Sequence, residues 1–315
     1  MAFISVLLAL MLEQFRPLPM RNPVYRVIAR TVDATERSMN AGERTHGILA
    51  WWLLVGGASI VMLALMWGIS RFGVLPLLAF NVAILFLTLG FRQFSHPFTE
   101  IQIALENGNT QAARNVLQAW MTEITPDFSA DRLTPNEITR HAIERAMLLA
   151  HRHVFGVFFW FVLAGAAGAV MYRLADFMAR RWKIKSPGHF GGFAATAFRW
   201  IDWAPVRLTA IGFAIVGDFE DAMYAWRHQS FTWPDSQAGI VLSAGAGALG
   251  VRLGGGRDMP LTATTPEVEA DTRVDPPLGV EAQPGHLRSA VGLVWRAMLL
   301  WLILLLMLSI AAWIT

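Results

Sequence analysis

Several ionisable residues lie within or beside apolar segments, where they could bind a substrate or hold helices in place. Arg173 and Asp176 are three residues apart, so one face of a helix can carry both. Asp202 precedes Trp203, and Arg207 follows four residues after the tryptophan. Charged groups at membrane depth mark substrate paths in many proteins, whereas an interfacial ion pair that fixes the depth of a helix is the structural alternative. Both interpretations stay open from the sequence.

A glycine-rich motif at residues 245–250, Gly-Ala-Gly-Ala-Leu-Gly, follows the apolar residues 240–242. A dinucleotide-binding glycine loop requires a βαβ unit around it, and no alternating strand pattern surrounds this one. One alternative is a bend whose backbone amides approach an anion beside Arg252, with Gly247 and Gly250 as contacts. The other alternative is a flexible turn at the membrane edge.

The remaining polar clusters predict no specific metal site or nucleophile. His151 and His153 are two apart and so lie on different faces of a helix, which favours two interfacial histidines over a shared metal. Asp218, Glu220 and Asp221 could bind Mg²⁺, but a solvated acidic surface is the simpler interpretation. The chain has no cysteine, which excludes disulfides and cysteine-ligated metals.

The elements that must position these residues are apolar helices. Of the 315 residues, 55% are hydrophobic and 16% are charged, whereas a soluble domain has about 25% charged residues. Residues 48–70, 73–91 and 292–315 are apolar runs long enough to cross about 30 Å of hydrocarbon. Only Arg71 and Phe72 separate the first two runs, which predicts a tight antiparallel hairpin. No basic stretch interleaved with aromatic residues indicates nucleic-acid binding.

The distribution of basic residues indicates which segments face the cytoplasm. Residues 16–47 carry six Arg against three acids, which places them in the cytoplasm. A full crossing by residues 155–174 would put the following basic residues, 180–199, outside. A re-entrant hairpin that turns at Gly165–Gly168 would keep them inside. The predicted fold class is therefore all-α, a polytopic transmembrane helical bundle with a helical cytoplasmic insert and, as one option, a re-entrant hairpin.

The predicted organisation has six consecutive parts: an N-terminal helix and basic cytoplasmic segment (1–47), a transmembrane hairpin (48–91), a cytoplasmic helical insert (92–153), membrane core segments with the Gly-rich turn (154–253), a flexible linker (254–291) and a C-terminal transmembrane helix (292–315). The linker is rich in Gly, Pro and acids, a composition that cannot bury enough apolar surface to order itself. Within the insert, Thr134 and Glu137 predict a capping box, and Asn109 predicts a helix N-cap.

Six stretches spread over nearly the whole chain share a pattern with one known family: Leu7–Arg37 with the turn Asn22-Pro23-Val24, His46–Trp51, Asn107–Arg114, Phe159–Trp160 with Ala167–Arg173, Asp202–Thr209, and Ser243–Gly255. They resemble the CobD/CbiB family of cobalamin-biosynthesis membrane proteins, which has AmpE as a relative. The resemblance implies the attachment of aminopropanol, or its phosphate, to adenosylcobyric acid through an amide, late in cobalamin synthesis.

The resemblance also implies roles for individual residues. If the chain is an enzyme, an adenosylcobinamide-phosphate synthase-like amide ligase, it would use ATP and Mg²⁺; no other cofactor is predicted. The candidate catalytic residues are then Glu144, Asp176 and Asp202. The arginines would bind phosphate or propionate, and the candidate substrate-binding residues are Arg173, Arg207, Arg252, Gly247 and Gly250. No metal ligand is assigned.

The sequence departs from the family pattern where the family carries acids. Glu144 matches the first acid of a polar family stretch, but residues 147–153 are apolar, His or Arg. The family's Asn-Thr-Leu-Asp after the tyrosine is Asp176-Phe177-Met178-Ala179 here. The apolar framework is kept while most acids that could hold a metal are replaced. This pattern favours a divergent, AmpE-like branch and a non-catalytic membrane sensor of the β-lactamase-induction type as the alternative function.

Either function places the chain in the bacterial inner (cytoplasmic) membrane as a multi-pass protein. The expected partners are the lipid bilayer and a corrinoid or a phosphate-bearing small molecule, and no nucleic acid is expected. The sequence assigns no oligomeric state. A transporter is a further alternative that only the re-entrant element suggests.

Overall fold

The computed structural model describes residues 2–15, 23–40, 42–123, 125, 127–186, 188–254 and 279–314. These residues are almost entirely helical, which confirms the predicted all-α class. Within them, three helical stretches are long and apolar enough to cross a membrane, namely Arg44–Ser70, Pro135–Lys185 and His286–Ala311.

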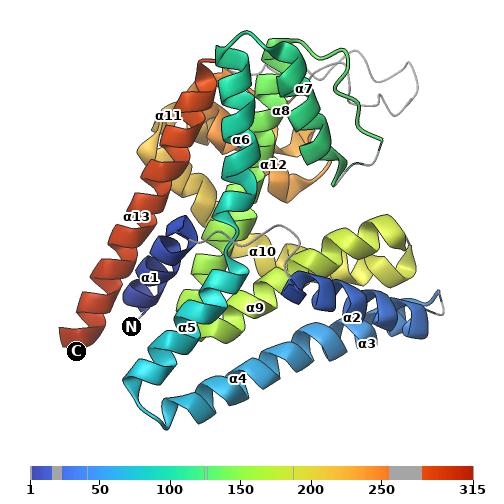
Figure 1. Ribbon diagram of the computed structural model, residues 1–315, viewed down its shortest axis with the longest axis vertical. Helices are drawn as coiled ribbons and strands as arrows, with labels where there is room; N and C mark the ends of the chain where they lie inside the picture. Colours follow the sequence, from blue (N-terminus) through green and yellow to red (C-terminus); the bar gives the residue numbers. More distant parts are fainter. Residues whose placement is uncertain are drawn as a thin grey trace. The chain divides into compact units, whose positions relative to one another are not determined.

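The elements follow one another in the order shown in Figure 1: α1 (Ala2–Phe15), α2 (Pro23–Met39), α3 (Arg44–Trp51), the π-helical turn η1 (Trp52–Gly56), α4 (Gly57–Ser70), α5 (Val74–Thr88), α6 (Phe91–Glu106), α7 (Thr110–Thr122), α8 (Pro135–Ala150), the π-helical turn η2 (His151–Phe155), α9 (Gly156–Lys185), α10 (His189–Val216), α11 (Phe219–Gln229), the 3₁₀ turn η3 (Ser230–Thr232), α12 (Ser236–Leu249), β1 (Val251–Arg252), β2 (Val280–Glu281) and α13 (His286–Ile314).

The chain divides into two compact units. The first comprises Met1–His96, Leu149–Thr209 and Met298–Thr315, and the second comprises Pro97–Leu148 and Ala210–Ala297. Helices α6, α8, α10 and α13 contribute residues to both units.

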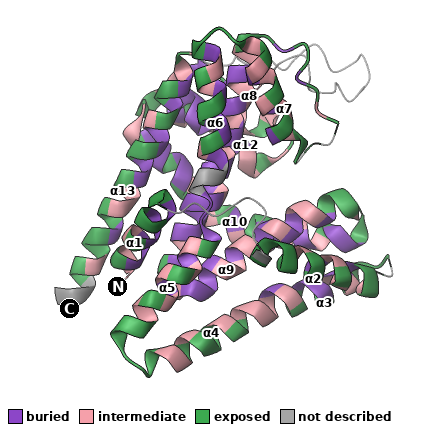
Figure 2. Ribbon diagram, in the orientation of Figure 1, coloured by how far each residue is buried: buried purple, intermediate pink, exposed green. Residues whose placement is uncertain are grey.

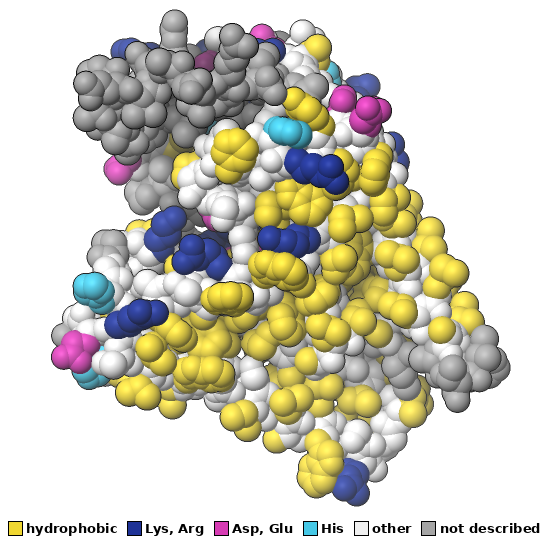
Figure 3. Space-filling view, turned by 180° about the vertical axis from the view of Figure 1, so that it is seen from behind, with side chains coloured by type: hydrophobic (Ala, Val, Ile, Leu, Met, Phe, Trp, Pro, Cys, Tyr) yellow, Lys and Arg dark blue, Asp and Glu magenta, His cyan; other side chains and the backbone are white. Residues whose placement is uncertain are grey.

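In the first unit, α4 and α5 form the predicted antiparallel hairpin. The turn between them uses Gly73, whose φ of +108° favours glycine. Both helices pack on α9, and α5 also packs on α1. No residue of α4 is buried (Figure 2). Large side chains such as Ile60 and Trp67 are more than 60% exposed. Hydrophobic side chains also cover much of the surface in Figure 3, as expected of a protein whose surroundings are lipid.

The helix α9 turns back on itself near its middle. The backbone is non-helical at Ala164 (φ −134°, ψ 18°) and at Gly165 (φ 60°, ψ −148°). This turn divides α9 into a first arm, residues 156–163, and a second arm, residues 166–185. The long apolar stretch Pro135–Lys185 is therefore not one straight span.

Two glycines show how closely the arms pack. A Cβ atom on Gly168 would lie 2.1 Å from the backbone oxygen of Trp160, and one on Gly156 would lie 2.2 Å from the hydroxyl of Tyr172. Residues eight and sixteen positions apart are about 12 and 24 Å apart along a straight helix. The arms are therefore antiparallel, so the chain reverses at Ala164 and Gly165, at the start of the Gly165–Gly168 segment where the hairpin option placed the turn. Its re-entry into a membrane stays a prediction.

In the second unit, local capping signals hold as predicted. The backbone N–H of Thr134 donates to Glu137 Oε2 (2.7 Å), and the N–H of Glu137 donates to Thr134 Oγ1 (3.3 Å). These bonds form the capping box at the start of α8. At the start of α7, the side chain of Asn109 accepts from the N–H of Ala112 (3.0 Å).

The glycine-rich motif is helical, which corrects both predicted alternatives, the anion-binding bend and the flexible turn. Residues 245–249 belong to α12, and only Gly250, with φ +64°, ends the helix in the left-handed conformation. A Cβ on Gly247 would lie 2.3 Å from the backbone oxygen of Asp221, so this glycine allows α12 to pack tightly on α11. A helix precedes the glycines, so a dinucleotide-binding strand–loop–helix arrangement is excluded.

The predicted linker lies mostly outside the described residues. The strand β1 lies just before the predicted linker and pairs in parallel with β2, which lies within the linker's described C-terminal part, with Val251 opposite Val280. The helix α13 begins at His286, so residues 286–291 are helical, whereas a start at residue 292 was predicted.

Candidate functional site

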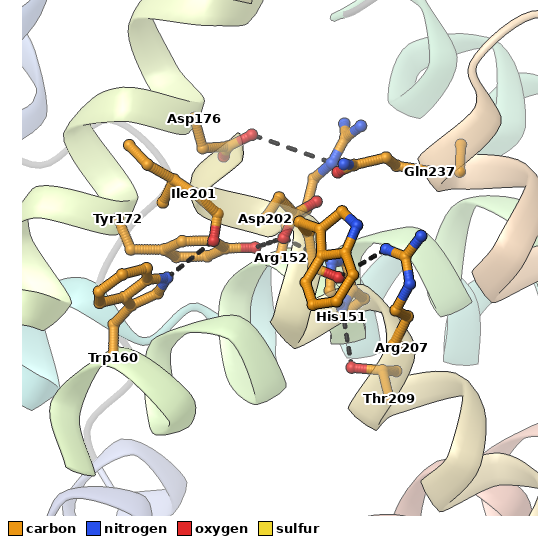
Figure 4. Close-up of polar contacts among 12 residues, drawn as sticks. His151, Arg152, Trp160, Tyr172, Asp176, Ile201, Asp202, Arg207, Thr209 and Gln237 are labelled. Carbon is orange, nitrogen blue, oxygen red and sulfur yellow. Dashed lines mark hydrogen bonds and ion pairs between the residues drawn. The ribbon is translucent and has the colours of Figure 1, made fainter. Parts of the chain in front are cut away.

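A buried polar network joins three helical segments of the first unit (Figure 4). His151 lies in η2, Tyr172 in the second arm of α9, and Asp202 and Thr209 in α10. His151 Nε2 lies 3.0 Å from Asp202 Oδ1, and His151 Nδ1 lies 2.9 Å from Thr209 Oγ1. The hydroxyl of Tyr172 donates to the same Oδ1 atom of Asp202 at 2.8 Å. All four residues are at most 2% exposed.

The local sequence explains why these side chains meet. Asp202 and Thr209 are seven residues apart, so they lie on one face of α10, two turns from each other. The imidazole of His151 bridges them. Gly156 has no side chain, and the ring of Tyr172 occupies the space that a larger residue would need. The network therefore depends on the α9 hairpin.

A proline in α10 fixes that helix against the first arm of α9. Pro205 has no N–H, so the carbonyl four residues earlier, that of Ile201, lacks its helical partner. The indole Nε1 of Trp160 donates to this carbonyl at 3.1 Å. Because an unpaired buried carbonyl is costly, this contact selects the position of α10.

The order hydroxyl, imidazole, carboxylate is one that can activate an oxygen nucleophile or move a proton. Here Thr209, His151 and Asp202 supply the three groups. Their burial keeps them from bulk water, so the network acts from inside the protein. Its evident effect is to place Asp202 and the helices that carry it.

A second cluster, which we call the arginine cluster, surrounds the carboxylate of Asp176. Its guanidinium groups belong to Arg180, Arg173 and Arg152, at 2.6, 3.3 and 3.9 Å from the carboxylate oxygens. The side chain of Asp176 is fully buried, whereas those of the arginines are 18–30% exposed. Three positive charges around one negative charge leave two in excess, which makes the cluster a candidate site for an anion.

The surroundings of Asp176 do not fit a Mg²⁺ ion. Mg²⁺ requires several oxygen ligands in an octahedron, and no group of three or more His, Asp or Glu is placed to hold a metal among the described residues. The nearest charges to Asp176 are three cations, which would repel a divalent cation. We therefore derive no metal-dependent step from this carboxylate.

Further along α9, a salt bridge ties the second arm to α2. Asp33 accepts from Arg181 Nε and Nη2, both at 2.5 Å, and lies 3.0 Å from Lys185 Nζ. The hydrogen bonds from Arg181 lower the pKa of Asp33 to about 2. Its carboxylate is therefore charged at neutral pH, and α2 is held to this arm.

The structure brings together only some of the residues singled out from the sequence. Arg173 and Asp176 form the predicted ion pair, and Asp202 lies in the buried network. Arg207 donates to the carbonyl of Trp203 on its own helix (2.8 Å), with its guanidinium 4.1 Å from that ring.

The other candidates lie in the second unit. Glu144 accepts from the N–H of Gly254 at 2.8 Å and lies 3.7 Å from His141. Arg252 donates to the carbonyl of Gly279 at 3.4 Å. Gly247 lies between two helices, and Gly250 ends α12. The catalytic role of Glu144 and the substrate-binding roles of the other three residues stay predictions.

Sequence reasoning missed part of the site and took two buried histidines for interfacial ones. The two histidines predicted at the membrane interface are buried, His151 at 1% and His153 at 4% exposure. Arg180 follows Asp176 by four residues, a helical spacing that could have revealed it. His151 and Arg152 carried no such local signal, because their partners are distant in the sequence.

The apolar helices, the chain reversal and the buried polar groups define an all-helical membrane protein. The sequence model described as CobD/Cbib protein matches residues 6–276, and the chain belongs to this family. It is 31% identical to the Cobalamin biosynthesis protein CobD of Stutzerimonas stutzeri over 310 residues. This aligned region covers 96% of this chain and 97% of the relative.

Two further relatives carry the same name. The protein from Chromobacterium violaceum is 33% identical over 261 residues, 80% of this chain and 79% of its own. The protein from Mycobacterium tuberculosis is 27% identical over 260 residues, 80% of each chain. No solved structure matches the chain significantly.

Proposed function

We propose that this protein acts in cobalamin biosynthesis, in the step that joins aminopropanol or its phosphate to adenosylcobyric acid through an amide. We place it in the bacterial inner membrane with several crossings. Membership of the CobD/CbiB family and the names of its relatives support the pathway. The single structural observation that carries the finer proposal is the arginine cluster.

Both substrates of this reaction carry anions. Aminopropanol phosphate has a phosphate group, and adenosylcobyric acid has the propionate that becomes the amide. A guanidinium binds either group with two parallel hydrogen bonds. Asp176 orients the arginines and neutralises one of their three charges. The two remaining charges would attract the substrate anion and hold it.

The residues near the cluster would then have distinct tasks. Arg173 and Arg180 are the proposed contacts for the anion, because both reach Asp176 from its own helix and stay partly exposed. Asp202 and His151 are positioning residues, which keep α10 and the α9 arms in register. Activation of the carboxyl by ATP and Mg²⁺ would require ligands other than Asp176.

The non-catalytic AmpE-like sensor stays an alternative prediction. The replacement of the family's acids by apolar, His or Arg residues at positions 147–153 favours the sensor. The relatives reported above are instead named for cobalamin biosynthesis. A sensor could use the same arginine cluster to bind an anion without turnover. The corrinoid pathway is therefore the property to test first.

The test is complementation of a cobalamin-producing strain that lacks the gene. Arg180→Gln removes one charged contact, and a hydrogen bond to a charged group contributes about 1.5–3 kcal/mol, equivalent to about tenfold to a hundredfold in affinity. We expect cobalamin output to fall at low external aminopropanol phosphate and to recover as that compound is raised. The matched control is Arg199→Gln, an exposed arginine of α10 outside the cluster. Equal cobalamin output from the two variants at every concentration of aminopropanol phosphate would refute the proposed contact between Arg180 and the anion.

A further inference from the structure

We propose that α2 lies in the membrane–water interface and that Arg26, Arg30 and Arg37 bind the phosphate groups of anionic phospholipids. The helix has three distinct faces, each with its own chemistry. One face packs on the protein, one is apolar and exposed, and one is basic and exposed.

The inner face of α2 is fixed to the first unit. Val32 is 1% exposed, and Asp33 forms the salt bridge with Arg181 and Lys185. Glu36 accepts a hydrogen bond from Ser186. These contacts use both acids of the helix, and they fix the direction of its two outer faces.

No described residue covers the apolar outer face. Val24, Val27 and Ile28 follow one another at helical spacing and are 43%, 60% and 36% exposed. Thr31 and Thr35 continue the same stripe. Exposed valine and isoleucine in water would be unfavourable, whereas the acyl–headgroup boundary would bury them.

The basic face flanks this stripe. Arg26, Arg30 and Arg37 are separated by four and seven residues, so they share one side of the helix. All three are exposed, and none forms an ion pair with another residue in the described part of the chain. An apolar stripe beside a row of arginines is the arrangement of helices that lie in the plane of a membrane surface.

The charges identify the lipid. Arginines near a membrane surface gain about 1 kcal/mol each from anionic lipids, or about fivefold in affinity. The helix also packs on α3, which is the first part of the apolar stretch Arg44–Ser70. A nucleic acid would leave the apolar outer face in water, and a neutral lipid would leave the arginines without counter-charges. An anionic phospholipid satisfies both faces.

The absence of cysteine makes the depth of α2 directly measurable, because a single introduced cysteine takes one label. We would place a fluorophore at Val27→Cys in the full chain, reconstituted in nanodiscs containing phosphatidylglycerol. We expect quenching by nitroxide-labelled lipid and protection from aqueous iodide. A label at Ala119→Cys, an exposed position on α7, is the control and should be quenched by iodide. Iodide quenching at residue 27 equal to that at residue 119 would overturn the proposal.

A second measurement tests the arginines. Native mass spectrometry would count the phosphatidylglycerol molecules retained by the wild-type chain and by two triple variants at Arg26, Arg30 and Arg37. The glutamine triple should lose bound anionic lipid, whereas the lysine triple should keep most of it. Equal retention by the glutamine triple would contradict the proposal. So would a Val27→Cys label shielded from both quenchers by a second copy of the chain. Neither measurement depends on cobalamin synthesis.

Discussion

Replacing Gly168 with alanine tests the α9 hairpin, on which the candidate site depends. The added Cβ would lie 2.1 Å from the backbone oxygen of Trp160. Contacts of that kind are ordinary only beyond 3.4 Å, so the two arms would have to separate by about 1.3 Å. The obstructing atom belongs to a helix backbone and cannot rotate away. The same movement would strain the hydrogen bond from Trp160 to Ile201.

Two opposing effects set the size of the change. Alanine is favoured over glycine within a helix by about 1 kcal/mol. Overpacking a close-packed interior costs about 1–3 kcal/mol, and a rigid backbone contact belongs at the upper end. The cost of steric overlap therefore exceeds the gain in helix propensity, and we expect the free energy of unfolding to fall by about 2 kcal/mol. For a domain of 150–250 residues, this lowers the Tm by about 4–8 °C.

The assay is thermal unfolding of the purified protein in detergent, with Gly68→Ala as the matched control. Gly68 also lies within a helix, but a Cβ there would meet nothing within 4 Å. We expect this control to be neutral or slightly stabilising. If Gly168→Ala were as stable as Gly68→Ala, the arms would not be in contact and the reasoning would fail.

Three further predictions concern charged and hydrogen-bonded groups. The pKa of Asp33 is lowered to about 2, below about 3.9 for an unfolded chain, so the salt bridge stabilises the fold fully above about pH 4 and this contribution is lost as the pH falls towards 2. Asp33→Asn should therefore make the Tm less dependent on pH over that range. An unchanged slope of Tm against pH would refute the salt bridge. Asp176→Asn should destabilise the protein by about 3 kcal/mol because it leaves three guanidinium groups without a counter-charge. Asp176→Glu, which keeps the charge, should destabilise it less in the same unfolding assay. Equal losses of stability in the two variants would argue against a charge effect. Tyr172→Phe should cost about 1.5–3 kcal/mol through loss of the bond to Asp202, and an unaffected Tm would show that this bond is not made.

The parts of the fold that could be predicted from the sequence depend on local patterns. The hairpin of α4 and α5 follows from two apolar runs with two residues between them. The capping box at Thr134 and the cap at Asn109 need only neighbouring residues. The chain reversal in α9 was predicted because a straight span conflicted with the basic residues that follow it, together with the small residues at its centre.

The parts that were missed depend on contacts between distant segments. His151 meets Asp202 only because the α9 hairpin and Pro205 place α10 beside it. The spacing of His151 and His153 argues only against a shared metal, and no residue nearby in the sequence indicates that His151 has a buried partner. The sequence predicts Gly247 in a bend or a flexible turn, but its role is to allow two helices to approach. Spacing alone does not distinguish a glycine that turns the chain from one that packs it.

The most direct test of the central claim is the corrinoid content of a deletion strain that makes cobalamin de novo, measured by liquid chromatography and mass spectrometry. If the protein acts in the amide-forming step, adenosylcobyric acid should accumulate, its aminopropanol amide should be missing, and the wild-type gene should restore it. Normal levels of the amide and of cobalamin in the deletion strain would contradict the proposed function.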